Sequence, residues 1–136
     1  EMCIRDSVDF DPLTCTPRPK QERIPILVGG DTPAAIRRAA KLADGYYPGT
    51  GDFAELQKLI TDLRHAAEDN DRDPAEIEIN AHFSVFGEGD RTEGVEKMRE
   101  AGVGRIMVPG FIFGGPSGME QLQEFGESVV SKTKTN

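Results

Sequence analysis

Ile24-Pro25-Ile26-Leu27-Val28-Gly29-Gly30-Asp31-Thr32-Pro33 is the stretch of sequence that decides the fold. Its first five residues form a short apolar run, which is typical of a parallel strand that is covered on both faces. Two glycines end the run, two helix N-cap candidates follow, and the proline occupies a favoured first-turn position. The next segment places its apolar residues on one helical face, at Ile36, Ala39, Ala40 and Ala43. The stretch therefore predicts a strand, a tight turn and a helix.

The same order of strand and helix repeats three more times along the chain. We expect further strands over 46–49, 77–86 and 105–109, and further helices over 53–67, 92–101 and 118–129. Strict alternation of this kind predicts an α/β fold with four parallel strands. Residues 1–23 contain no such unit, and the prolines at 12, 17 and 19 favour an extended arm. The chain thus divides into an arm, 1–23, and an α/β region, 24–136.

Composition and charge exclude several classes of protein. The formal net charge is −8, so the surface does not attract nucleic acid or an anionic membrane. No apolar run reaches the roughly 18 residues of a membrane span. The first residues lack the basic region and apolar stretch of a secretory signal, so we expect none. Cys3 and Cys15 match no metal or redox spacing, and two unpaired thiols fit a reducing cytoplasm. We expect a cytoplasmic protein without a metal site.

The turn formed by Gly29, Gly30, Asp31 and Thr32 is the sharpest candidate for a binding site. Glycines let an anion approach the backbone, and the free amides and dipole of a helix N-terminus favour negative charge, most often phosphate. Any tight turn between a strand and a helix also uses glycine, so the spacing alone leaves both readings open. Because the Asp31 carboxylate would repel a phosphate, we expect it to cap the helix.

Polar residues alternate with apolar ones along the third predicted strand, at Glu78, Asn80, His82 and Ser84. In a closed barrel these residues would line the interior, with His82 and Ser84 nearest the mouth where barrel enzymes place their sites. A strand with one face in solvent gives the same pattern, and we favour this second reading. His82 and Ser84 form no catalytic triad, because no orienting acid can be assigned.

Local patterns predict how the helices begin and what the last loop does. Asp52 with Glu55, and Ser117 with Glu120, have the spacing of a capping box. The apolar loop from Phe111 to Gly115 either flanks a ligand or packs under a neighbouring element, and we favour the second reading. His65 falls on the charged side of its helix, where we expect it to be solvated.

Taken in order, these segments resemble the luciferase-like monooxygenase family. The resemblance is carried by four segments, which are Pro17–Lys20 with Ile24–Gly30, Thr32–Ala40, Ala43–Pro48 and Arg72–Pro74. Asp71 stands where the family usually has glycine. The family fold is a (β/α)₈ barrel, which implies that this chain supplies its C-terminal half. The resemblance also implies that a cofactor phosphate lies at Gly29, Gly30, Asp31 and Thr32.

The chemistry that the resemblance implies is hydride transfer between a deazaflavin, coenzyme F420, and a small organic substrate. Gly102–Pro109 and Phe125-Gly126 are similar to the deazaflavin-using branch, and FMN is the alternative cofactor. The ring pocket and the proton-transfer groups of the family lie mostly in the other half of the barrel, so no catalytic residue is assigned. A non-catalytic α/β module that binds a phosphorylated ligand or a partner subunit remains a further alternative. A complete small doubly wound domain is disfavoured, because it gives the resemblance no role.

Two expectations concern the ends of the fragment. Residues 1–7 match nothing in the family, and Met2–Ser7 resembles a translated sequencing adapter, so we expect the genuine coding sequence to begin near Val8. Four strands cut from an eight-stranded barrel leave two raw edges, which closure normally removes. We therefore expect a homo-oligomer, and no turnover by this chain alone.

Overall fold

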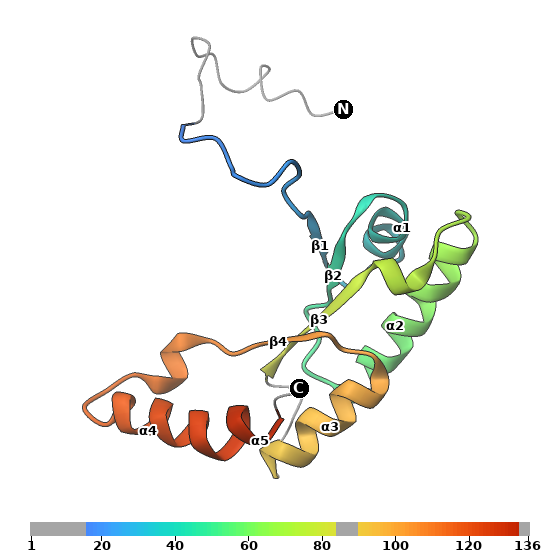
Figure 1. Ribbon diagram of the computed structural model, residues 1–136. Helices are drawn as coiled ribbons and strands as arrows, with labels where there is room; N and C mark the ends of the chain where they lie inside the picture. Colours follow the sequence, from blue (N-terminus) through green and yellow to red (C-terminus); the bar gives the residue numbers. More distant parts are fainter. Residues whose placement is uncertain (1–15, 84–89, 134–136) are drawn as a thin grey trace.

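Four parallel strands alternate with helices in the computed structural model, which describes residues 16–83 and 90–133. The strands are β1 (Leu27–Gly29), β2 (Gly45–Tyr47), β3 (Glu78–His82) and β4 (Arg105–Met107), and they form one sheet in the order β1-β2-β3-β4. Helices α1 (Pro33–Leu42), α2 (Phe53–Glu68) and α3 (Arg91–Ala101) follow the first three strands. Figure 1 shows these helices along one side of the sheet. The predicted α/β fold is confirmed.

The last unit differs from the others, because a loop and a broken helix follow β4. The loop contains a short 3₁₀ segment, η4 (Gly110–Phe113), and α4 (Gly118–Phe125) runs into a π-helical stretch, η5 (Gly126–Val130), and then α5 (Ser131–Thr133). Another 3₁₀ segment, η2 (Pro74–Glu76), precedes β3. In Figure 1, α4 extends beyond the β4 edge of the sheet.

A single apolar core fills the space between the helices and the sheet. The predicted face of α1 is buried, and α2 adds Leu56, Leu59, Ile60 and Leu63 to the same core. Val28, Tyr46, Ile79 and Ala81 supply the side of the sheet that faces these helices, as the alternation of side chains along a strand requires. Small alanines on α1 allow it to lie close to both the sheet and α2.

Helix ends follow local rules with one exception. Asp52 and Asp90 accept hydrogen bonds from the amides of Glu55 and Thr92, and Gly102 ends α3 in the left-handed conformation with a φ of 93°. The Ser117 side chain makes no capping bond and instead accepts from Gln121 Nε2, so the second predicted capping box is wrong.

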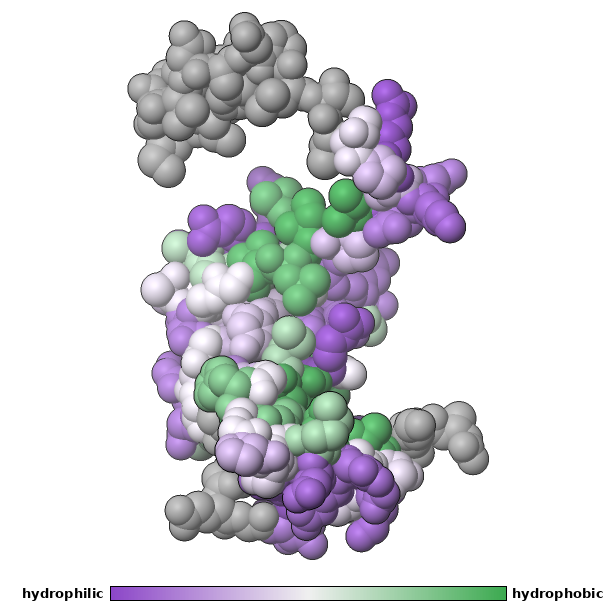
Figure 2. Space-filling view, turned by 90° about the vertical axis from the view of Figure 1, so that its left-hand side faces the viewer, coloured by the Kyte–Doolittle hydropathy of each residue, from purple (hydrophilic) through white to green (hydrophobic). Residues whose placement is uncertain are grey.

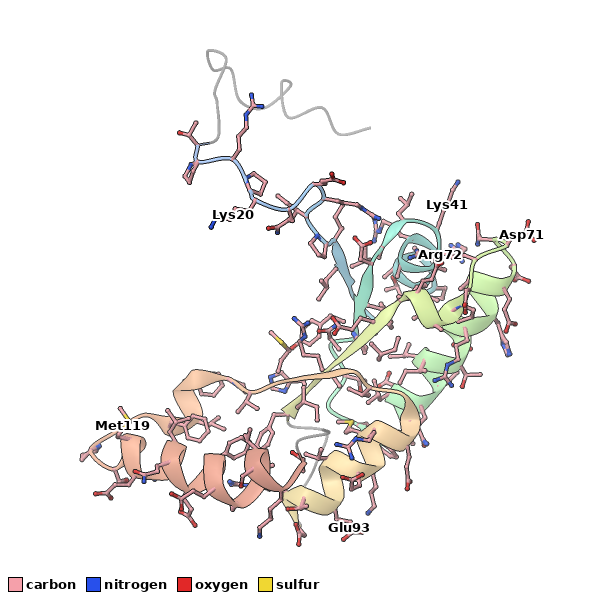
Figure 3. The ribbon with its side chains drawn as sticks, in the orientation of Figure 1. Lys20, Lys41, Asp71, Arg72, Glu93 and Met119 are labelled. Carbon is pink, nitrogen blue, oxygen red and sulfur yellow. The ribbon has the colours of Figure 1, made fainter. Side chains whose placement is uncertain are left out.

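Long-range polar contacts tie the helices together at their ends. Arg72, just beyond α2, donates from Nη1 to the carbonyl oxygen of Ala40 in α1 at 3.3 Å and pairs with Glu76. Figure 3 shows Arg72 in the loop after α2, close to Asp71, which has a φ of 54°. Asparagine and aspartate adopt this left-handed conformation more easily than most other residues. Asp71 is therefore compatible with a position where the family that the sequence resembles usually has glycine.

The prediction that the first strand is covered on both faces is wrong. Ile24 and Ile26 are 59% and 55% exposed, and Leu27 is also exposed. Figure 2 shows the face on the left of Figure 1, where separate hydrophobic areas have more polar surface between them. The strand is exposed because β1 is an edge of the sheet, with β2 as its only strand neighbour among the described residues.

No helix in the described part of the chain is long and apolar enough to cross a membrane.

Candidate functional site

The backbone conformation of the turn between β1 and α1 requires glycine at only one of its two glycine positions. Gly30 has a φ of 112°, whereas Gly29 has no positive φ and continues β1 beside Tyr47. The Gly30 amide donates to the carbonyl oxygen of Tyr47 at 3.2 Å, which ties the turn to the neighbouring strand. A side chain at Gly30 would strain the backbone, while a Cβ at Gly29 would meet the Tyr47 carbonyl oxygen at an ordinary 3.4 Å.

The side chain of a buried tyrosine, Tyr46, forms a hydrogen bond with the backbone of the turn. The Tyr46 ring is fully buried against the helices, and its hydroxyl donates to the Gly30 carbonyl oxygen at 2.8 Å. Burial raises the pKa of the Tyr46 hydroxyl to about 12, and the nearby charges of Asp31 and Asp62 act in the same direction. Sequence reasoning missed this residue, because an aromatic residue in a strand predicts core packing and does not reveal where its hydroxyl points.

Asp31 does not cap α1, which corrects the sequence-based expectation. Thr32 takes that role, with Oγ1 accepting from the Ala35 amide at 3.2 Å. The Asp31 carboxylate turns toward the loop after β2 and accepts from the Gly49 amide at 2.7 Å. This contact joins two successive loops at the carboxyl ends of parallel strands, the edge at which α/β folds bind ligands.

The loop after β2 is itself fixed by a short chain of polar contacts. The Thr50 hydroxyl donates to Glu55 Oε2 and accepts from the Asp52 amide at 3.1 Å, while Asp52 Oδ1 accepts from the Glu55 amide. Glu55 therefore reaches the Asp52 amide through Thr50, where a simple capping box would have a direct contact. The loop that receives Asp31 is consequently well defined.

Backbone donors remain available on the open side of the turn. Within the described part of the chain, no hydrogen bond is recorded for the amides of Asp31 and Thr32, and both residues are exposed. Pro33 has no amide hydrogen, so these two donors stand at the positive end of the ten-residue helix α1. The turn from Gly29 to Thr32 thus presents two free donors, at Asp31 and Thr32, while the Gly30 amide is bound to Tyr47. Free amides at a helix N-terminus are the groups that bind an anion.

The sheet face opposite the helices carries the polar residues of β3. Glu78 pairs with Arg105 on β4 at 3.1 Å, and His82 is half-buried at the carboxyl end of β3. Asn80 is fully buried, which contradicts the favoured reading of a solvent-facing strand. Its Nδ2 donates to the Glu78 carbonyl oxygen at 3.2 Å, and its Oδ1 has no hydrogen-bond partner among the described residues. Ser84 lies outside the described residues.

Gly45 explains how Asn80 becomes buried in an open sheet. A Cβ at Gly45 would stand 3.0 Å from the Glu78 carbonyl oxygen, 3.2 Å from Leu27 Cγ and 3.3 Å from Asn80 Nδ2. The missing side chain lets residues of β1 and β3 close over the strand between them. Asn80 is therefore buried at the centre of this face, while Leu27 and Met107 at its two edges stay exposed.

Two other sequence-based expectations have mixed outcomes. His65 is exposed, as predicted. Of the Phe111–Gly115 loop, Phe113 packs edge-on against Phe125 with ring centroids 5.6 Å apart, whereas Phe111 is largely exposed. No group of three or more potential metal ligands occurs among the described residues.

Comparisons with known proteins agree with this geometry. The model of the family described as luciferase-like monooxygenase matches residues 6–127. Proteins of Mycobacterium tuberculosis and Mycobacterium bovis, both named as uncharacterized, are 34% identical over 134 residues, covering 91% of this chain and 44% of each relative. The chain therefore spans less than half the length of these curated relatives.

A solved structure shares the fold. The coenzyme F420 dependent tetrahydromethanopterin reductase of Methanopyrus kandleri superposes with a TM-score of 0.63 at 14% identity, covering 82% of this chain and 51% of that protein. Four units that correspond to about half of a larger chain confirm the half-barrel prediction. The free edges at β1 and β4 are the places where such a sheet would continue.

Proposed function

Because this chain belongs to the luciferase-like monooxygenase family, we propose that it forms the cofactor-phosphate-binding half of a flavin- or deazaflavin-dependent oxidoreductase. The observation that carries the proposal is the β1–α1 turn, where the free amides of Asp31 and Thr32 meet the N-terminus of α1. Such a turn binds phosphate through backbone donors and the helix dipole.

The residues of the turn fit a phosphate group. Gly29 presents no side chain on the sheet face opposite the helices, so the backbone there can be approached closely. The Asp31 carboxylate is engaged by the Gly49 amide, which supplies a partner for its charge away from the free amides. Tyr46 and Tyr47 fix the position of Gly30 before any ligand arrives, so little ordering accompanies binding.

Coenzyme F420 is the proposed cofactor, and FMN is the alternative. The solved reductase with the same fold is described as dependent on coenzyme F420, which supports the first choice. Both molecules carry a phosphate, and this is the only part that the turn would contact. When bound, such a cofactor supplies the hydride-transfer chemistry. The residues of this chain would hold the phosphate, and the remaining barrel units would bind the ring and a small organic substrate.

The proposal is tested by amide NMR on the isolated chain with matched ligands. FMN is expected to shift the resonances of Gly30, Asp31 and Thr32, whereas riboflavin, which has the same ring without the phosphate, is expected to leave them unchanged. Coenzyme F420 is then compared with FMN to rank the two cofactors. Equal responses to riboflavin and FMN, or none to any of the phosphorylated ligands, would remove the turn from the proposed site.

A kinetic test asks whether catalysis requires the remaining barrel units, which this chain does not contain. The chain alone is expected to show no oxidation of reduced deazaflavin or FMN with enone or aldehyde substrates, because the ring pocket lies outside it. Reproducible turnover proportional to the concentration of this chain would contradict the proposed division between the two halves.

A further inference from the structure

The carbonyl group of Gly30 and the amide of Asp31 belong to one peptide group of the β1–α1 turn. This peptide is trans, so its carbonyl oxygen and its N–H point in opposite directions. The carbonyl oxygen accepts the hydroxyl proton of Tyr46 at 2.8 Å, and the Tyr46 side chain is fully buried in the core. The Asp31 N–H therefore points away from the core, toward the open side of the turn.

The other recorded contacts of the turn do not set the direction of this N–H. The Gly30 amide bonds to the Tyr47 carbonyl oxygen, but this amide belongs to the preceding peptide. The Gly49 amide donates to the Asp31 carboxylate at 2.7 Å, which holds the side chain of Asp31. A peptide group can rotate between two fixed Cα atoms, so both contacts would survive its rotation. Within the described residues, no donor to the Gly30 carbonyl oxygen other than Tyr46 is recorded.

Glycine at position 30 makes this contact important. The φ of 112° requires glycine, and glycine has more conformational freedom than any other residue. Every conformation in which the Asp31 N–H points elsewhere must be given up when a ligand binds, which lowers the affinity. A hydrogen bond that already excludes these conformations in the free protein therefore strengthens binding.

Tyr46 can impose this orientation because its own position is fixed. Its backbone lies in β2, paired with Val28 of β1, and its ring packs among the core residues beneath α1 and α2. A phenylalanine would fill the same space and would donate no proton. The hydrogen bond to the Gly30 carbonyl oxygen also polarises the amide of the same peptide, because hydrogen bonds in a chain strengthen one another.

We propose that Tyr46 is a positioning residue for the cofactor phosphate. Its hydroxyl orients the Gly30–Asp31 peptide, and the Asp31 amide then donates to a phosphate oxygen. The inference rests on the proposed function, because it concerns the same turn, and it assigns a binding role to a side chain that the phosphate does not contact. The Thr32 amide lies in the next peptide, for which no contact with Tyr46 is recorded in the described structure, so it serves as an internal comparison.

Tyr46→Phe tests the inference by amide NMR on the whole chain. In the ligand-free protein, the ¹⁵N resonance of Asp31 should move more than that of Thr32, because the lost hydrogen bond belonged to the Asp31 peptide. The dissociation constant for FMN, followed at the Asp31 amide, should rise about three- to ten-fold, as expected for one neutral hydrogen bond. The resonance shift separates orientation of the peptide from a general loss of stability.

Ile77→Val is the matched control for stability. Ile77 is 3% exposed and precedes β3, at the end of the sheet opposite the turn, and its truncation lowers the stability by an amount similar to the loss of one hydrogen bond. This variant should leave both the Asp31 resonance and the dissociation constant for FMN unchanged.

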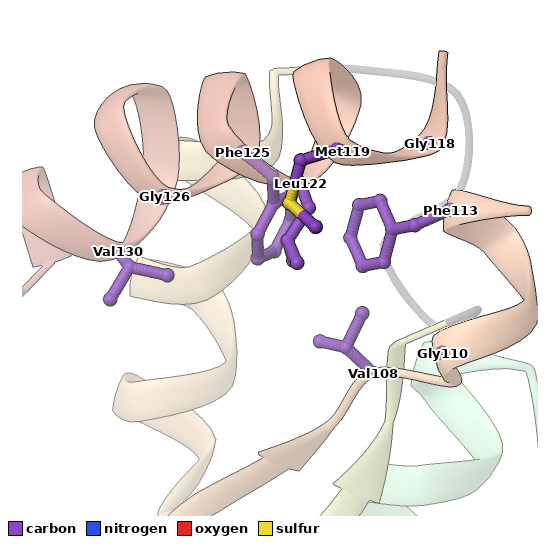
Figure 4. Close-up of a pocket in the computed structure, with 9 residues that line it drawn as sticks. All are labelled: Val108, Gly110, Phe113, Gly118, Met119, Leu122, Phe125, Gly126 and Val130. Atoms are coloured by element: carbon purple, nitrogen blue, oxygen red, sulfur yellow. The ribbon is translucent and has the colours of Figure 1, made fainter. Parts of the chain in front are cut away.

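Riboflavin is the matched control for binding of the flavin ring elsewhere on the chain. An apolar groove of about 510 Å³ lies between the residues after β4 and α4, and the described residues that line it carry no polar side chain (Figure 4). A ring that enters this groove acts alike in riboflavin and FMN, so the difference between the two ligands reports the phosphate. Tyr46→Phe should change this difference and leave the response to riboflavin as it is.

The possible outcomes distinguish this inference from the proposed function. A dissociation constant for FMN that is unchanged in Tyr46→Phe, or that rises equally in Ile77→Val, would overturn the role of Tyr46 and leave the phosphate site in place. An Asp31 resonance that moves no more than that of Thr32 would overturn it as well. The absence of any phosphate-dependent response in the parent chain would overturn the proposed function, and this inference with it.

Discussion

Replacing Tyr46 with Phe removes one hydroxyl from a fully buried ring and keeps the ring itself. The hydroxyl donates to the Gly30 carbonyl oxygen at 2.8 Å, and no other donor to this oxygen is recorded in the described structure. Loss of a neutral hydrogen bond in a buried setting costs about 1 kcal/mol. We expect the free energy of unfolding at neutral pH to fall by about that amount, with the helix content unchanged.

Alkaline pH gives a sharper signature of the same contact. Folding raises the pKa of the Tyr46 hydroxyl from its usual 10.0 to about 12, chiefly because the buried ring disfavours the phenolate. Above pH 10 the unfolded chain releases this proton while the folded chain retains it, so unfolding becomes easier as pH rises. The raised pKa of Tyr46 contributes about 3 kcal/mol to the free energy of unfolding. This contribution is fully present below pH 10 and is lost as pH rises toward 12. Tyr46→Phe should lack this component.

The chain offers a matched control, because its only two tyrosines are Tyr46 and its neighbour Tyr47. In a Tyr47→Phe variant, the ultraviolet absorbance of tyrosinate reports Tyr46 alone, and its titration midpoint should lie well above 10. Urea unfolding at a series of alkaline pH values then compares the two variants with the parent chain. A midpoint close to 10 in Tyr47→Phe, or an alkaline loss of stability that persists in full in Tyr46→Phe, would refute the argument.

Three further predictions concern single positions. Gly30→Ala should lower the free energy of unfolding by about 1–2 kcal/mol because of its φ of 112°, while Gly29→Ala should change it by less than about 0.5 kcal/mol; equal effects in urea unfolding would contradict the assigned turn. Hydrogen bonds from the backbone amides of Thr92 and, to a lesser extent, Glu93 lower the pKa of Asp90. Its contribution to stability is therefore present above the ordinary carboxyl pKa and is lost as pH falls through the lowered value. Asp90→Asn should keep the helix cap and reduce this acid dependence, as measured by urea midpoints in acid. Asn80→Leu removes a buried oxygen that has no hydrogen-bond partner in the described part of the chain, and it should raise the free energy of unfolding by about 1 kcal/mol; a decrease would show that this oxygen is satisfied in solution.

Features set by residues close together in the sequence were predictable. Gly102 ends α3 in the left-handed conformation, and Ile36, Ala39 and Ala40 form the buried face of α1, because a helix terminus and a helix face depend on local spacing. Even here, nearby alternatives compete. The expected cap at Ser117 was wrong because the Gln121 side chain occupies its hydroxyl.

Features set by distant partners were not predictable. The donor to the Gly30 carbonyl oxygen comes from Tyr46, 16 residues away, and the donor to Asp31 comes from Gly49, 18 residues away. The turn itself was visible in the sequence, but only the register of β1 against β2 decides which groups meet there. Burial of Asn80 likewise depends on the space left by Gly45 on a neighbouring strand.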